Sequence, residues 1–310
     1  MAFAHSDFDP REIVVADVKT AYLTALRSDS LYVHLPKDHP NHGKFLWLLN
    51  RAFYGLRDSG NLWDRSRNKT LAAAGWVPSS VRRMWWKWTG KPEAPTSRLL
   101  SILPAFVDDF AILPIGRSAV QLACKIIAKG GYQMKITKPK NGTLRWAGVD
   151  FNVSRDSVHI HQTEYLLSLP LLEGMGDPVD SSASNPSSVP TPPPDLFLLL
   201  PSSRELPSEP LRLLTAQEGK AFHERLGCLL WVARDTRPDL SQGYNQLSRH
   251  SSAPTHADAD YLLSLLRYAR RTATSRILRI SRSDVPSTSS PLFTKSWSDA
   301  ALGSAGNVHP

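Results

Sequence analysis

The chain reads AFVDDFAIL from Ala105 to Leu113, an apolar run that two adjacent aspartates, Asp108 and Asp109, interrupt. Successive residues of a strand point to opposite faces, so the two carboxylates cannot both face water on a half-buried strand. Burying an ionised carboxylate among such residues costs several kcal/mol unless a cation or hydrogen-bond donors compensate. A hairpin with both aspartates at its tip avoids this cost. We therefore predict a β-hairpin centred on Asp108 and Asp109.

This hairpin tip has two explanations. A hard divalent cation could bridge the carboxylates, or the pair could be an ordinary turn without a metal, since Asp is a common turn residue. A third carboxylate near the pair would favour the metal site over the ordinary turn. Glu12–Val18 is a short apolar strand that ends close to Asp17. If this strand neighbours the hairpin, Asp17, Asp108 and Asp109 converge as in a two-metal phosphoryl-transfer site.

Composition narrows the class of protein. The 310 residues are 41% hydrophobic and 21% charged, which is typical of a globular protein with one or two cores. The net charge of +9 is compatible with a nucleic-acid partner but does not require one. The two cysteines, Cys124 and Cys228, are too few for a disulfide framework or a cysteine zinc site. The sequence has no signal peptide and no apolar run of 18 residues, so we expect an intracellular, cytoplasmic protein that is neither secreted nor membrane-bound.

Several motifs occur in the order found in the reverse transcriptase domain of Ty1/copia-type retrotransposon polyproteins, which nearly the whole chain resembles. FVDD at Phe106–Asp109 is similar to the YVDD box of that family. The remaining motifs are ADVKTAYL at Ala16–Leu23, LYVHLP at Leu31–Pro36, RAFYGLRDSGNLW at Arg51–Trp63, the hairpin leading to Gln162 and Tyr165, and TRPD at Thr236–Asp239.

The resemblance implies an α+β fold. It would be a right-hand polymerase palm, an antiparallel sheet backed by helices, with a helical thumb and with the fingers largely missing. The implied activity is RNA-directed DNA polymerisation, in which two Mg²⁺ ions assist nucleotidyl transfer to a primer 3′-hydroxyl. The implied partners are an RNA template, a DNA primer and deoxynucleoside triphosphates, in a cytoplasmic retroelement particle. The alternative is a catalytically inactive retroelement remnant with at most weak nucleic-acid binding.

The resemblance also assigns residues around the nucleotide. Asp17, Asp108 and Asp109 would be the catalytic acids and metal ligands, with Asp17 and Asp108 the principal ligands. Tyr22 would pack under the sugar of the incoming nucleotide, unless it is an ordinary core tyrosine. Arg57 would contact phosphate or template, unless it is a solvated surface arginine. Asp58 and Gly60 depart from the family pattern, and an acid at Asp58 would repel phosphate.

Further residues would contact the primer and template. Gln162 and Tyr165 match a hairpin that grips the primer terminus in the family. Arg267, Arg270 and Arg271 would contact the phosphates of the hybrid from the thumb, or else form a solvated basic helix face. Lys135 and Lys138 both lie where the family places a lysine beside the nucleotide, and spacing does not decide between them.

Four regions follow from the motifs. Residues 1–176 would form the palm with partial fingers and the primer-grip hairpin, 177–210 a Pro- and Ser-rich linker, and 211–282 the thumb. Residues 283–310 resemble the truncated start of a ribonuclease H domain, in which Asp299 would be the first metal ligand. No acid follows Asp299, so we expect no ribonuclease H activity.

Local patterns predict individual elements. We expect helices over Asn61–Ala74, Ser118–Gly130 and Ala257–Arg271, and a further helix that begins at Thr215 with a capping box. The tryptophans of Arg82–Trp88 favour a strand whose indoles pack on the helix behind it, over a base-stacking surface.

Overall fold

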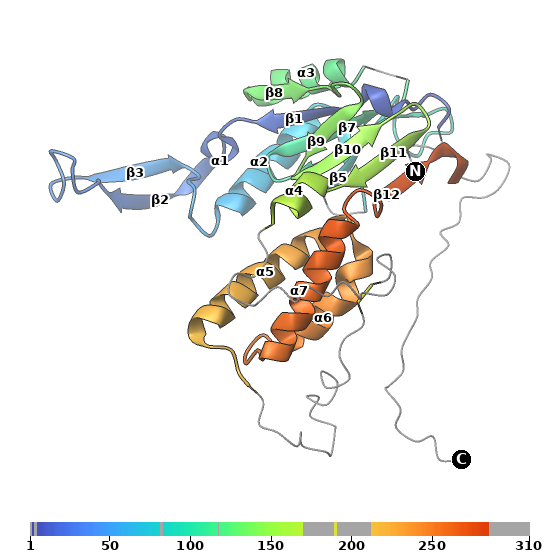
Figure 1. Cartoon of the computed structure of the whole chain (residues 1–310). Coiled ribbons are helices and arrows are strands. Elements are labelled where there is room, and N and C mark those ends of the chain that lie inside the picture. The colour runs from blue at the N-terminus through green and yellow to red at the C-terminus, as the bar shows by residue number, and fades with distance from the viewer. Residues whose placement is uncertain are drawn as a thin grey trace, which may run out of the picture.

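The fold is α+β with antiparallel sheets (Figure 1). A computed structural model describes residue 2 and residues 5–80, 83–116, 118–169, 189–190 and 212–284. The linker predicted over 177–210 therefore lies outside the described residues, apart from 189 and 190. The predicted ribonuclease H start, with Asp299, also lies outside them, apart from 283 and 284.

A six-stranded sheet forms the centre of the molecule. Its strand order is β4 (Trp76–Pro78), β5 (Met84–Trp88), β6 (Leu99–Phe106), β7 (Asp109–Pro114), β1 (Val14–Val18) and β8 (Met134–Thr137). All neighbours are antiparallel. Val107 and Asp108 connect β6 to β7, which confirms the predicted hairpin, although Asp109 begins β7 instead of sharing the turn.

Two helices cover one face of this sheet, α2 (Ser59–Ala73) and α3 (Ala119–Gly130), and both confirm the helices predicted there. Trp63 and Ile126 are fully buried in the core between the helices and the sheet. Trp85 belongs to this core, whereas Trp86 and Trp88 stack on each other over the opposite face, with ring centroids 6.1 Å apart. Packing on a helix was therefore the right prediction for Trp85 and the wrong one for Trp86 and Trp88, because strand residues alternate between faces.

A second sheet packs on the other face of the six-stranded sheet. Its order is β12 (Leu278–Ser281), β11 (Ser157–His161), β10 (Val149–Val153) and β9 (Thr143–Trp146). Val15 and Ile102 of the first sheet form a common core with Leu144 and Val158 of the second. Residues 278–281 were assigned to the helical thumb by sequence, but they form β12 and pair with β11.

Helices of the C-terminal half build a separate core. They are α4 (Thr163–Ser168), α5 (Ala216–Asp235), α6 (Ser241–Arg249) and α7 (His256–Arg271), with a 3-10 turn, η4 (Pro238–Leu240), between α5 and α6. Thr215 and Glu218 form the predicted capping box of α5, and Thr255 and Asp258 form a second one at α7. We call α5–α7 the helical unit. Leu166 of α4 packs into its core, which joins the unit to the second sheet. Among the described residues, no helix has the length and apolarity that a membrane span requires.

A two-stranded hairpin extends away from both sheets (Figure 1). It consists of β2 (Leu26–His34) and β3 (Leu46–Arg51), and the short helix α1 (Ala21–Thr24) connects it to β1. Tyr32, Trp47 and Leu48 are about half exposed on it, at 56%, 48% and 46%. The hairpin therefore contributes surface and little core.

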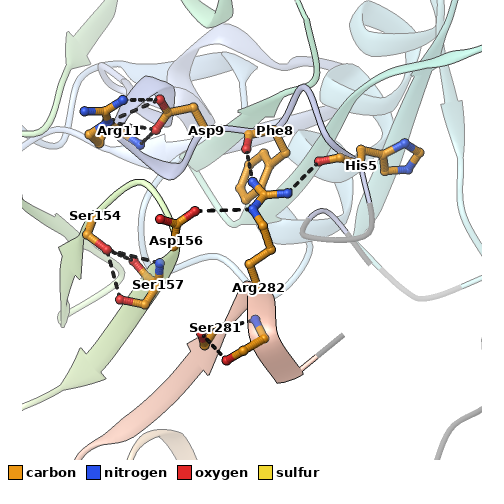
Figure 2. Close-up of polar contacts among 10 residues, drawn as sticks. His5, Phe8, Asp9, Arg11, Ser154, Asp156, Ser157, Ser281 and Arg282 are labelled. Carbon is orange, nitrogen blue, oxygen red and sulfur yellow. Dashed lines mark hydrogen bonds and ion pairs between the residues drawn. The ribbon is translucent and has the colours of Figure 1, made fainter. Parts of the chain in front are cut away.

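Arg282 ties three distant segments together (Figure 2). It lies in the 3-10 turn η5 (Arg282–Asp284) after β12. Its Nη1 and Nη2 donate to the carbonyls of His5, at 3.2 Å, and Phe8, at 2.7 Å. Its Nε lies 3.5 Å from the Asp156 carboxylate in the turn between β10 and β11. The N-terminal segment leads through η2 (Pro10–Glu12) into β1, and it is thus held by the turn that follows the last described strand.

Replacing Arg282 with Ala is expected to lower the free energy of unfolding by about 1–3 kcal/mol, because the substitution removes charge-assisted hydrogen bonds to backbone carbonyls. Urea unfolding measures this change. Arg279→Ala is the control, since Arg279 is exposed on β12, just before the turn that carries Arg282, and a surface substitution of this kind changes stability by about 0.5 kcal/mol or less. Equal effects of the two substitutions would contradict the role given to Arg282.

Candidate active site

The strand register brings Asp17 opposite Asp109. β1 pairs with β7 in an antiparallel register that runs from Val14 opposite Ile112 to Asp17 opposite Asp109. The predicted neighbourhood of these strands is therefore confirmed. Directly opposed residues point to the same face, so both carboxylates lie on the face that the second sheet covers, with their Cβ atoms about 5 Å apart. Both residues are half-buried.

The turn that carries Asp108 is held from two sides. The Val18 N–H donates to the Asp108 carbonyl at 3.0 Å. On the helical side, the Val107 carbonyl accepts from Trp63 Nε1 at 2.7 Å and from Arg67 Nη1 at 3.3 Å. Val107 has φ 53, which a β-branched residue rarely adopts, at a cost of about 1–3 kcal/mol. The buried donors on α2 offset this strain and fix the direction in which the turn points.

Replacing Trp63 with Phe is expected to destabilise the protein by about 1–3 kcal/mol, because a buried turn carbonyl loses its shortest hydrogen bond. Thermal unfolding of the whole chain measures the effect. Trp47→Phe serves as the control because Trp47 is 48% exposed on β3. If both substitutions gave the same melting temperature, the Trp63 contact would carry no stabilising role.

The pKa values of Asp108 and Asp109 are raised above the ordinary value for an aspartate. Burial is the largest cause that raises the pKa of Asp108, and the Asp17 charge adds to it. Burial also raises the pKa of Asp109, with further contributions from the charges of Asp108 and Asp17. The three aspartates therefore repel one another, and a cation between them would relieve the repulsion. In the described part of the chain, no group of three or more His, Cys, Asp or Glu side chains is arranged to hold a metal ion.

Two further residues continue the row of side chains across the sheet. Lys135 of β8 lies opposite Asp17, and Phe106 of β6 lies opposite Asp109. Lys135 is exposed, and Phe106 is 41% exposed. The row Lys135, Asp17, Asp109 and Phe106 thus presents a cation, two carboxylates and an aromatic ring on one face. Spacing left Lys135 and Lys138 equivalent, and the register places Lys135, not Lys138, opposite Asp17.

The segments that carry Tyr22 and Arg57 meet where Tyr22 contacts Tyr54. Tyr22 of α1 packs edge-to-face on Tyr54, with ring centroids 5.0 Å apart, and also contacts the core beneath the sheet. Arg57 is exposed just before α2.

Asp58, which departs from the family pattern, pairs with Arg27 through two hydrogen bonds of 3.1 and 2.7 Å. These bonds lower the pKa of Asp58. Arg27 also pairs with Asp29 at 2.7 Å, so it is shared between two acids and offsets the Asp58 charge only in part.

Two curated proteins of Arabidopsis thaliana are similar to this chain. It is 26% identical over 260 residues to the retrovirus-related Pol polyprotein from transposon RE2, and 24% identical over 259 residues to that from transposon RE1. The similarity covers 81% of this chain in each case, but 16% and 15% of the relatives, so the chain spans about one sixth of their length. No family model matches the chain. The similarity supports a retrotransposon Pol origin.

The residues predicted to contact primer lie at the joint between the second sheet and the helical unit of this retroelement-derived chain. Gln162 is 1% exposed, and its Oε1 accepts from Thr236 Oγ1 at 2.8 Å. A buried side chain cannot touch a primer directly, so this placement gives Gln162 a structural role at the joint. Tyr165 is half-buried, and burial together with the Cys228 thiol raises its pKa to about 12.

The TRPD motif forms a buried network inside the helical unit. The guanidinium of Arg237 donates to both Asp239 oxygens, at 2.9 and 2.8 Å, and also to the Ala269 carbonyl and to Thr272 Oγ1. Tyr268 donates its hydroxyl to Asp239 at 2.9 Å. Arg237 is 2% exposed. TRPD entered the sequence analysis only as a family-like motif, and this structural role was not predicted, although an arginine two residues before an acid was the available signal.

The basic residues predicted for phosphate contact lie on α7. Arg267 and Arg270 are half-buried and Arg271 is exposed. A spacing of three and four residues puts them on one side of the helix. Arg270 and Arg271 also lie in the last turn, where positive charge favours the helix dipole. Their placement is compatible both with a phosphate-binding face and with a solvated one.

Proposed function

We propose that this chain is the reverse transcriptase part of a retrotransposon Pol polyprotein, an RNA-directed DNA polymerase that extends a primer with deoxynucleotides. The observation that carries the proposal is the pairing of Asp17 with Asp109 beside the turn at Asp108. The six-stranded sheet with α2 and α3 would be the palm, the β2–β3 hairpin the fingers portion present in this chain, and the helical unit the thumb. The chain would act in a cytoplasmic retroelement particle.

The donor set suits Mg²⁺. This ion prefers oxygen ligands and is usually held by one or two carboxylates together with substrate phosphates. Asp17 and Asp109 would supply such oxygens from facing positions on β1 and β7, and Asp108 would join them from the adjoining turn only if a bound cation drew its carboxylate in. Their mutual repulsion favours a cation. Two bound Mg²⁺ ions would lower the pKa of the primer hydroxyl and neutralise charge on the triphosphate. The Pol similarity supports the retrotransposon origin from which the proposal starts.

The other residues of the row would bind and orient the substrates. Lys135 would attract the triphosphate across the edge of β8, and Phe106 offers an aromatic face to a base or sugar at the primer end. Tyr22, supported by Tyr54, would lie under the sugar of the incoming nucleotide. Arg57 is exposed and would contact phosphate or template, since Asp58 pairs with Arg27 and not with Arg57.

Template-directed primer extension tests the proposal. The whole chain is incubated with poly(rA)/oligo(dT), dTTP and Mg²⁺, and extended primers are resolved on a sequencing gel. We expect extension that chelation of Mg²⁺ abolishes and that Asp109→Asn removes. Equal signals from the wild-type chain and the variant would overturn the proposal and leave the alternative, an inactive retroelement remnant with at most weak nucleic-acid binding.

A further inference from the structure

A buried arginine lies beneath the turn that carries Asp108. Arg67 of α2 is 2% exposed. Its Nη1 donates to the Val107 carbonyl at 3.3 Å and also lies 2.8 Å from Asp64 Oδ1 on the same helix. Its Nη2 donates to Asn68 Oδ1 at 3.1 Å. Arg67 therefore connects α2 directly to the turn of the candidate active site.

A cation at this buried position is costly. Burial lowers the pKa of the Arg67 guanidinium, because the charged form loses its water. Its Nε is buried without an acceptor in the part of the chain that the structure describes. Well-packed apolar residues in place of a buried ion pair are often neutral or stabilising. Residues that cost stability in this way concentrate at functional sites, and the group that Arg67 reaches is the turn.

The turn depends on donors that hold it from the helical side. Val107 has φ 53, which is a strained conformation for a β-branched residue. Its carbonyl accepts from the neutral indole of Trp63 and from the charged guanidinium of Arg67. On the other side, the Asp108 carbonyl accepts from the Val18 N–H at 3.0 Å. The peptide between Val107 and Asp108 is thus fixed between α2 and β1.

We propose that Arg67 is a positioning residue for the candidate active site. It holds the peptide between Val107 and Asp108 so that the Asp108 carboxylate lies within reach of a cation bound between Asp17 and Asp109. Partners of metal ligands commonly act in this way, and their loss lowers metal affinity by about tenfold to a hundredfold. The effect on metal binding rests on the proposed function, whereas the hold on the turn does not.

Hydrogen exchange of a single amide tests the hold on the turn. The Val18 N–H bonds to the Asp108 carbonyl, so its exchange rate, measured by NMR, reports movement of the turn. Arg67→Met removes the charge and the donors, and we expect it to speed this exchange about tenfold relative to the other amides of β1. Arg67→Lys keeps a charged donor and should stay within about threefold of wild type.

Arg65→Met is the matched control. Arg65 is exposed on the same helix, so this variant loses the same type of side chain from a surface position, and Val18 exchange should not change. A merely structural arginine would speed all amides of β1 together, because the whole protein would unfold more often. If Arg67→Met does not fold, the double variant Asp64→Asn with Arg67→Met leaves no carboxylate without its partner and serves in its place.

Metal titration tests the consequence for the carboxylates. Mn²⁺, which electron paramagnetic resonance detects directly, replaces Mg²⁺ as the probe. We expect Arg67→Met to weaken Mn²⁺ binding about tenfold and Arg67→Lys to restore it to within about threefold of wild type. In primer extension, Arg67→Met should raise the Mg²⁺ concentration for half-maximal rate and leave the KM for primer–template unchanged.

Val18 exchange that is the same in Arg67→Met and Arg65→Met would overturn the proposal. So would a faster exchange that all amides of β1 share, equal effects of Arg67→Lys and Arg67→Met, or wild-type Mn²⁺ affinity in a variant whose Val18 exchange is faster. Faster Val18 exchange in Arg67→Met, in a chain that binds no Mn²⁺ and extends no primer, would sink the proposed function and leave the hold of Arg67 on the turn standing.

Discussion

Asp109→Asn is expected to slow template-directed primer extension by at least about 10³-fold, because it removes a charged ligand from a site whose metal ions supply several kcal/mol of transition-state stabilisation. The Asp17–Asp109 pair lies at the centre of the row of side chains that would bind the triphosphate. Single-nucleotide incorporation measures the rate. Asp260→Asn is the matched control, since Asp260 is exposed on α7 and far along the chain from the turn. A variant rate within tenfold of wild type would contradict the assignment.

The same substitution should act in the opposite direction on stability when no metal is bound. Burial and the neighbouring carboxylates raise the pKa of Asp109 above its ordinary value of 3.8. Because the pKa of Asp109 is higher in the folded protein than in the unfolded chain, the protonated carboxyl favours the folded state. This stabilisation is complete below pH 3.8, the pKa in the unfolded chain, and is lost as the pH rises through the folded-state pKa. Asp109→Asn should therefore be more stable than wild type at pH 7 in the absence of metal, with a smaller difference below pH 3.8.

Urea unfolding at both pH values, with and without Mg²⁺, measures this difference. Mg²⁺ should stabilise the wild-type chain and narrow its difference from Asp109→Asn at pH 7, because a cation binds the folded state through the carboxylate that the variant lacks. An equal response of both proteins to Mg²⁺ would contradict a metal site at these aspartates, whatever the activity assay shows.

Arg237→Met is expected to lower the free energy of unfolding by about 3–5 kcal/mol, because it leaves Asp239 as a partly buried charge without its partner. The guanidinium also loses its hydrogen bonds to Ala269 and Thr272 near the end of α7. Urea unfolding of the whole chain, followed by circular dichroism at 222 nm, measures the loss. The control is Arg234→Met, since the Arg234–Asp235 pair lies on the surface, with the arginine side chain 56% exposed, and should contribute at most about 1 kcal/mol.

The pH dependence of this network follows from Asp239. Burial opposes its charge, but the hydrogen bonds and charge of Arg237, together with the Tyr268 hydroxyl, hold the pKa of Asp239 below its ordinary value. A lowered pKa contributes stability that is present above the unfolded value of 3.8 and is lost as the pH falls through the folded pKa. The difference between wild type and Arg237→Met should therefore shrink in acid. A difference that did not depend on pH would show that packing, and not the ion pair, carries the effect.

Local patterns were sufficient to predict several individual elements. The hairpin at Asp108 and Asp109 was predictable because charged residues within an apolar run must reach the end of a strand. The start of α5 was predictable because Thr215 and Glu218 satisfy each other within one turn of helix. The strand through Trp85 and Trp88 was predicted correctly. The side of the sheet was wrong for the indoles of Trp86 and Trp88, because the pattern does not say what covers each face.

The sequence by itself determined the hairpin, the amphipathic helices, their caps and the set of acidic residues, since these depend on contacts within a few residues and on the cost of burying charge. Only the tertiary structure decided that Asp17 faces Asp109, that Lys135 and not Lys138 continues their row, that Arg27 pairs with Asp58, and that Gln162 is buried against Thr236. It also placed β12 beside β11. These outcomes depend on strand register and on contacts between residues far apart in the chain, which no local pattern specifies.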